Sequence, residues 1–266
     1  MSVWEDLAVE VHDGNGPYAL FVHGFLSSRS HWLPNVGPLG EVCRPVVVEQ
    51  YGHGRASTPT DPERWSASAY GDAFEAIRRE LGSEPWYVVG HSLGGALTIR
   101  YAIERPESVL AHVFTNSQSA FADQAWTDQV VANSAKLAAR LEGPDGRTEL
   151  DNHPMHPRGA GRVPPDVSAA LVEDFGHHDP VGVAMQMRYT LPTASVRSLA
   201  SENKRPALLT IGSSETAFVE TAEHVREVMP HLESVELDAG HNVNLHAIDA
   251  WNEAVARFFA SHHPSS

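Results

Sequence analysis

Residues Gly90–Gly94 place a serine between two glycines, in the pattern Gly-x-Ser-x-Gly. An apolar run precedes the pattern and a helical pattern follows it, which predicts a strand, a sharp turn and a helix with Ser92 at the turn. The glycines are needed because a side chain at either position would collide with a neighbouring element. The helix N-terminus behind the serine favours developing negative charge. We expect Ser92 to be a nucleophile; the alternative is a glycine-rich turn with an incidental serine.

A serine hydroxyl needs a base before it can attack at neutral pH, and the chain offers 16 histidines. His241 follows the last predicted strand and precedes the final helix. Residues just past the carboxyl ends of parallel strands converge on one crevice, and Ser92 and His241 both lie at such positions. We expect His241 to be the base. Other histidines match no zinc-ligand spacing, so we expect no metal and no other cofactor; they are His153, His156, His177 and His178.

The imidazole of such a base is oriented by a carboxylate. Glu215 lies just past the predicted strand at residues 207–211 and is the best-placed acid. Glutamate is one methylene longer than aspartate, so its loop must sit slightly further back. Asp123 is a rival, because an acid can also be supplied after the strand that ends at Phe114. The choice between the two carboxylates stays open at this point.

Acyl transfer also needs donors aimed at the developing oxyanion. The backbone N–H of Leu93, directly after the serine, is one predicted donor, and the N–H of Phe25, in the loop after the first central strand, is the other. Large apolar side chains near these loops and in the inserted segment form the predicted substrate pocket: Leu26, Trp32, Trp126, Phe175, Met185 and Met187. Such side chains are also common in a plain hydrophobic core.

Short apolar runs without polar alternation must carry these groups, and they are typical of a parallel sheet covered on both faces. Helical patterns lie between them. This alternation predicts a doubly wound α/β fold. The predicted strands cover residues 7–11, 18–22, 46–49, 86–89, 109–114, 207–211 and 234–237, and the predicted helices between and after them cover residues 69–81, 95–105, 220–229 and 247–259.

Residues 119–203 interrupt the alternation, because they contain helical patterns at 125–141 and 165–175 but no clear strand. The stretch 143–164 between these helices is rich in glycine, proline and charge. A long structureless loop is improbable in a compact domain. We predict a core domain of residues 1–118 and 204–266, with residues 119–203 inserted as a helical cap over the strand ends. Alternatively, these helices extend the main layer.

Composition narrows the classes of partner. The chain has 266 residues, 42% of them apolar, and a formal net charge of −15. Such acidity disfavours nucleic acid and anionic membranes as partners. Cys43 is the only cysteine, so no internal disulfide is expected. We read no secretion signal and no membrane span, and we expect a cytoplasmic protein that acts on a small, apolar, ester-like molecule; a homodimer is left open.

Together these motifs resemble the α/β-hydrolase superfamily, in its order and over nearly the whole chain. The matching stretches are His23–Phe25, Gly52–Ser57, Gly90–Gly95, Gly212–Glu215 and Ala239–His241. The resemblance implies a mostly parallel sheet and a nucleophile, acid and base in the order Ser, Asp or Glu, His. The superfamily usually has aspartate where Glu215 stands.

Ser92 argues against the dehalogenases and epoxide hydrolases of the superfamily, which use aspartate at that position. A weaker similarity is to the menaquinone-pathway synthase that eliminates pyruvate. That enzyme holds substrate carboxylates with an arginine where this chain has Ala96.

We expect a serine hydrolase that cleaves a carboxylic ester, lactone or thioester through an acyl-enzyme. Three alternatives remain: a carbon–carbon hydrolase or lyase using the same triad, a cofactor-free perhydrolase, and a non-catalytic small-ligand receptor of the same fold.

Overall fold

The computed structural model describes residues 3–159 and 161–263. Seven strands form one sheet in the order β1-β3-β2-β4-β5-β6-β7, and every neighbouring pair is parallel except β1 with β3. This confirms the predicted doubly wound α/β fold. The strands are β1 (Glu10–Val11), β2 (Tyr18–Val22), β3 (Arg44–Val48), β4 (Trp86–His91), β5 (Val109–Thr115), β6 (Ala207–Gly212) and β7 (Leu232–Leu237).

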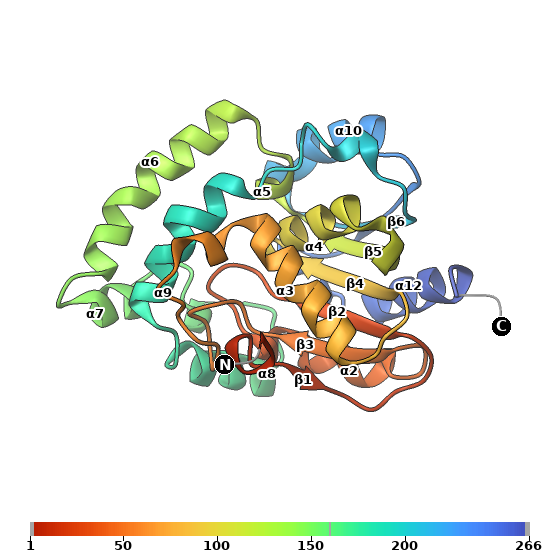
Figure 1. The fold of residues 1–266 in the computed structure, drawn as a ribbon, viewed down its shortest axis with the longest axis horizontal. Coiled ribbons are helices and arrows are strands. Elements are labelled where there is room, and N and C mark those ends of the chain that lie inside the picture. The colour runs from red at the N-terminus through yellow and green to blue at the C-terminus, as the bar shows by residue number, and fades with distance from the viewer. Residues whose placement is uncertain (1–2, 160, 264–266) are drawn as a thin grey trace.

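Helices cover both faces of the sheet (Figure 1). One apolar cluster joins the central strands to α3 and α4, and a second joins the opposite face to α2 and α12. The central strands are buried on both faces, which explains their uninterrupted apolar sequence. The helices of the core are α1 (Val3–Asp6), α2 (Leu33–Leu39), α3 (Ala67–Glu80), α4 (Leu93–Glu104), α10 (Val219–Val228), α11 (Val243–His246) and α12 (Ile248–Ser261).

The segment between β5 and β6 contains helices and no strand among its described residues. In Figure 1 its green and cyan ribbons lie at one end of the sheet. Part of it packs through its own apolar cluster, which includes Leu141, Phe175 and Val183 and also takes in Leu26 of the core. That this segment acts as a cap stays a prediction. Its helices are α5 (Gln118–Phe121), α6 (Gln124–Leu141), α7 (Gly146–Asp151), α8 (Pro165–Phe175) and α9 (Pro180–Met185).

Three local differences from the sequence-based expectations have physical causes. The strand predicted at residues 7–11 is reduced to Glu10–Val11, because α1 precedes it and Ala8 has a positive φ of 43°. The stretch 143–164 contains α7. Helix α2 was not expected, because two prolines and a glycine interrupt its pattern; one proline stands in its first turn, where no donor is lost.

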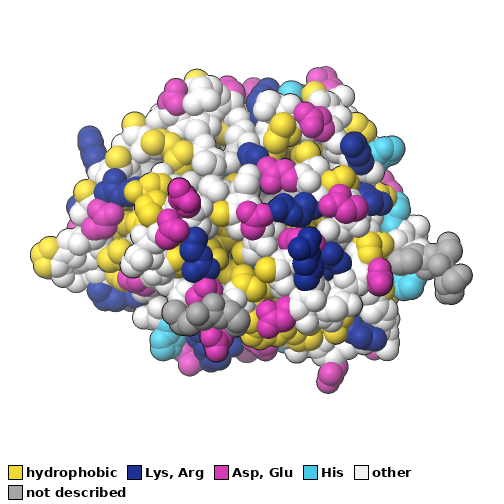
Figure 2. All heavy atoms as spheres, viewed as in Figure 1, with side chains coloured by type: hydrophobic (Ala, Val, Ile, Leu, Met, Phe, Trp, Pro, Cys, Tyr) yellow, Lys and Arg dark blue, Asp and Glu magenta, His cyan; other side chains and the backbone are white. Residues whose placement is uncertain are grey.

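The surface carries no dominant charged region on the face drawn in Figure 2, where acidic and basic side chains are interspersed. Within residues 3–159 and 161–263, no helix is both long and apolar enough to cross a membrane.

Candidate active site

Ser92 occupies the sharp turn between β4 and α4, with φ of 51° and ψ of −116°. This is a strained backbone conformation for a residue with a side chain. The flanking glycines make the turn possible: a Cβ on Gly94 would collide with the carbonyl oxygens of Val22 and His23, and one on Gly90 would collide with Thr98 and the Gly94 backbone. Close packing therefore fixes the turn that presents the serine.

His241 follows β7, and Glu215 follows the neighbouring strand β6. The His241 Nδ1 atom lies 3.4 Å from Glu215 Oε2, and their side chains are 41% and 20% exposed. The hydrogen bond from His241 lowers the pKa of Glu215, so the carboxylate stays ionised. Asp123 lies elsewhere: its carboxylate caps α6 by accepting the Trp126 N–H at 2.8 Å. Of the two candidate acids, the structure brings only Glu215 to the histidine.

Asn116, at the end of β5, connects the two loops that carry Glu215 and His241. Its amide nitrogen donates to the carbonyl oxygens of Gly240 and His241, both at 3.3 Å, and its oxygen accepts the Gly212 N–H at 3.4 Å. Asn116 is not among the candidate site residues of the sequence analysis, because an amide cannot serve as the acid. An amide side chain just past a buried strand was the available signal, since it can both donate and accept.

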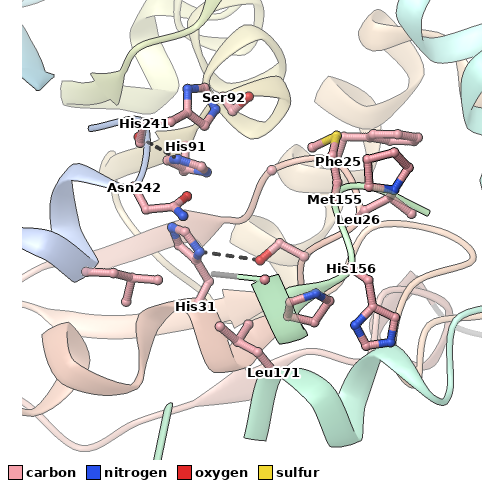
Figure 3. Close-up of a pocket in the computed structure, with 16 residues that line it drawn as sticks. Phe25, Leu26, His31, His91, Ser92, Met155, His156, Leu171, His241 and Asn242 are labelled. Atoms are coloured by element: carbon pink, nitrogen blue, oxygen red, sulfur yellow. Dashed lines mark hydrogen bonds between the residues drawn. The ribbon is translucent and has the colours of Figure 1, made fainter. Parts of the chain in front are cut away.

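Ser92 and His241 line the same cavity, which has a volume of about 240 Å³ (Figure 3). Among the described residues, no hydrogen bond joins Ser92 Oγ to the imidazole. Catalytic hydrogen bonds are often long before substrate binds. The walls are mainly apolar side chains and histidines, without Lys, Arg, Asp or Glu: Phe25, Leu26, His31, His91, Pro154, Met155, His156, Pro157, Leu171 and Leu245.

The N–H groups predicted to hold an oxyanion belong to Phe25 and Leu93. Phe25 lines the cavity with Ser92, and Leu93 is the first residue of α4. Neither N–H has an acceptor within the part of the chain that the structure describes. A free N–H beside a cavity is available to a bound molecule.

His91 lies against His241, His31 lies against His91, and neither was selected from the sequence. The ring of His91 is 5.0 Å from that of His241 and 4.3 Å from that of His31, and its Nε2 donates to the His241 carbonyl at 3.1 Å. Burial lowers the pKa of His31 to about 3 and that of His91 well below its usual value. Both imidazoles are therefore neutral at pH 7. Only His91, the last residue of β4, carried a signal in the sequence through its strand-end position; His31 lies in the turn Arg29–Trp32 and carried none.

Only Leu26 of the six side chains predicted to line the substrate pocket does line this cavity. Trp32 is fully buried against Phe21 and Trp251 in the core. The others lie in α6, in the apolar cluster of the inserted segment or against the core: Trp126, Phe175, Met187 and Met185.

Sequence reasoning missed the stretch Pro154–Gly159, which contributes much of the wall. It belongs to the stretch 143–164, which is rich in glycine, proline and charge and has no periodic pattern that would single out lining residues. Within residues 3–159 and 161–263, no group of three or more His, Cys, Asp or Glu side chains could hold a metal ion.

Comparisons with known proteins agree with the fold. A model of the alpha/beta hydrolase fold family matches residues 20–247. The solved structure of MenH from S. aureus superposes with a TM-score of 0.82 at 16% identity, covering 96% of this chain and 99% of that one. The enol-lactonase from Burkholderia xenovorans LB400 gives 0.74 at 19% identity, with 95% of each chain covered. At these identities the likeness shows the fold alone.

Curated relatives match over shorter stretches. A proline iminopeptidase from Heyndrickxia coagulans is 25% identical over 167 residues, which are 62% of this chain and 54% of that enzyme. The chain spans about a quarter to about half of the length of the first curated relatives it matches.

Proposed function

Because the chain belongs to the α/β-hydrolase fold family, we propose that it is a serine hydrolase that cleaves a carboxylic ester, lactone or thioester. The observation that carries the proposal is the common cavity of Ser92 and His241, with Glu215 3.4 Å behind the imidazole. The nucleophile Ser92 follows β4, the acid Glu215 follows β6 and the base His241 follows β7, so all three lie at the carboxyl ends of parallel strands.

In the proposed reaction, Ser92 Oγ attacks the carbonyl carbon while His241 Nε2 takes the hydroxyl proton. Glu215 accepts the Nδ1–H and stabilises the imidazolium that forms. The N–H groups of Phe25 and Leu93 hold the oxyanion. Collapse of the tetrahedral intermediate expels the leaving group, which receives the proton from His241. A water molecule, deprotonated by the same imidazole, then releases the acid and regenerates Ser92.

The cavity wall supports a neutral, mainly apolar substrate. Its 16 lining residues include no Lys, Arg, Asp or Glu, and a buried carboxylate without a cation is costly. This composition, with Ala96 after the serine turn, favours ester hydrolysis over the carboxylate-holding lyase chemistry considered from the sequence.

The test is Ser92→Ala, assayed with a panel of nitrophenyl esters and lactones. We expect a fall in kcat of about 10⁴-fold or more, since loss of a serine nucleophile leaves only residual catalysis. Ser68→Ala, on the exposed surface of α3, is the matched control and should retain wild-type kcat.

A fluorophosphonate probe followed by peptide mapping identifies the activated hydroxyl without knowledge of the substrate. The label should map to Ser92. Undiminished ester turnover by Ser92→Ala, or labelling at a different residue, would contradict the proposal.

A further inference from the structure

The loop that presents the Phe25 N–H contains a strained residue. Leu26 has φ of 56°, in the left-handed region that side chains other than glycine seldom adopt. Such a conformation is unfavourable and persists only where surrounding contacts hold it. A turn supplies one such contact, since the Ser27 N–H donates to the Gly24 carbonyl at 3.2 Å. The Leu26 N–H makes a second such contact.

His53 accepts that N–H. The Leu26 N–H donates to His53 Nε2 at 3.2 Å, and the opposite ring nitrogen, Nδ1, lies 3.0 Å from the Tyr51 carbonyl oxygen. A carbonyl oxygen can only accept, so Nδ1 carries the hydrogen and Nε2 is left with its lone pair for Leu26. Burial lowers the pKa of His53 to about 4, which keeps the imidazole neutral and able to accept at pH 7.

The loop that carries His53 is closely packed. It stands between two glycines with positive φ, Gly52 at 73° and Gly54 at 51°. A Cβ on Gly52 would lie 2.6 Å from the Gly182 Cα of helix α9, so this loop packs directly on the inserted segment. The Gly54 N–H donates to His178 Nδ1 at 2.9 Å, and the His178 ring lies 4.7 Å from that of His53.

We propose that His53 is a positioning residue for the oxyanion hole. It holds the Leu26 N–H, and with it the strained turn, so that the Phe25 N–H remains free and faces the cavity. His53 itself does not line the cavity and touches no substrate. The inference rests on the proposed hydrolase function for its catalytic consequence, whereas the loop support itself is independent of that function.

The first test compares His53→Leu, which removes the acceptor, with His53→Gln, whose side-chain oxygen replaces Nε2. A misplaced oxyanion donor affects the transition state, so kcat for a nitrophenyl ester should fall about 100-fold in His53→Leu, with KM within about threefold of wild type. A trifluoromethyl ketone, whose adduct mimics the oxyanion, should lose inhibition by a similar factor. His53→Gln should recover most of both.

The matched control is His112→Leu. His112 is also a buried histidine, bonded through Nε2 to Asn203 at 3.2 Å, but it lies within β5 and away from the cavity. It should lose thermal stability to a similar extent and keep kcat within about twofold.

The second test needs no activity. Hydrogen exchange of a peptide that contains residues 24–27 should accelerate in His53→Leu and remain slow in His112→Leu. Unchanged exchange in His53→Leu would overturn the proposal, and so would accelerated exchange with wild-type kcat. The Ser92→Ala variant tests the hydrolase function separately. If that function fails, the hydrogen-exchange result still decides whether His53 supports the loop.

Discussion

The two sides of the cavity are built differently. Its floor comes from loops that follow strands, with Gly24–Ser27 after β2, Ser92 after β4 and His241 after β7. Its roof is Pro154–Gly159 together with Leu171 of the inserted segment. The floor is tied by long-range contacts between strands, whereas the roof is held by short turns such as the Gly159 N–H bond to the His156 carbonyl at 3.0 Å. The strand ends thus supply the side of the cavity that holds Ser92 and His241, and the inserted segment supplies much of the opposite wall.

The largest expected effect comes from neutralising each of the two candidate acids in turn. Glu215→Gln removes the carboxylate behind the floor histidine and should lower kcat about 1000-fold, because an amide cannot stabilise the imidazolium. Asp123→Asn, at the start of α6 in the insertion, should stay within about threefold, since asparagine also caps helices. Both are measured as kcat with one ester. The opposite ranking would transfer the role of the acid to Asp123.

A second test places the same substitution on each side. In Gly94→Ala the new Cβ meets carbonyl oxygens of the neighbouring strand end, so the turn must shift. We expect the free energy of unfolding to fall by about 3 kcal/mol and most of the activity to be lost. Gly159→Ala has no atom within 4 Å of its Cβ and should change stability by less than about 0.5 kcal/mol. Denaturant unfolding measures both, and equal losses would refute the contrast.

The smallest expected effect is on the pH dependence of stability. The pKa of His31, in the floor, falls to about 3 through burial, below the usual 6.5 or so of an unfolded histidine. Between these values only the unfolded state binds the proton, so stability is full above about pH 6.5 and decreases as the pH falls.

Each such histidine contributes a slope of about 1.4 kcal/mol per pH unit. His31→Asn should therefore flatten the dependence between pH 6 and 5 by about 1 kcal/mol. His156→Asn, on the half-buried roof histidine, should flatten it much less. Urea unfolding at several pH values checks this, and equal slopes in the two variants would count against it.

The floor was predictable because local sequence and sheet geometry agree there. Glycines around Ser92, and a histidine and an acid just past apolar runs, mark positions that any parallel sheet gathers at one edge. The family match supports the same fold.

The roof was not predictable, because its residues meet the floor only through packing of the inserted segment. Met155 is 53% exposed, and Pro154–Gly159 has no hydrophobic period to identify it. Trp32 shows the converse error of inference: an aromatic residue close in sequence to the oxyanion loop packs into the core instead. Asn116 and His91 stand at strand ends, which the sequence indicates, but their hydrogen-bond partners lie more than 90 positions away and become known only from the structure.

The amide of Asn116 has a mechanical consequence. The side chain of Asn116 bonds to the Gly212 N–H and to the Gly240 and His241 carbonyls. It therefore holds together the loops that follow β6 and β7. The backbone that carries the imidazole is therefore anchored to the strand end that precedes the carboxylate. The His91 imidazole also holds the His241 carbonyl at 3.1 Å, so the base is anchored on its other side to the residue beside the nucleophile.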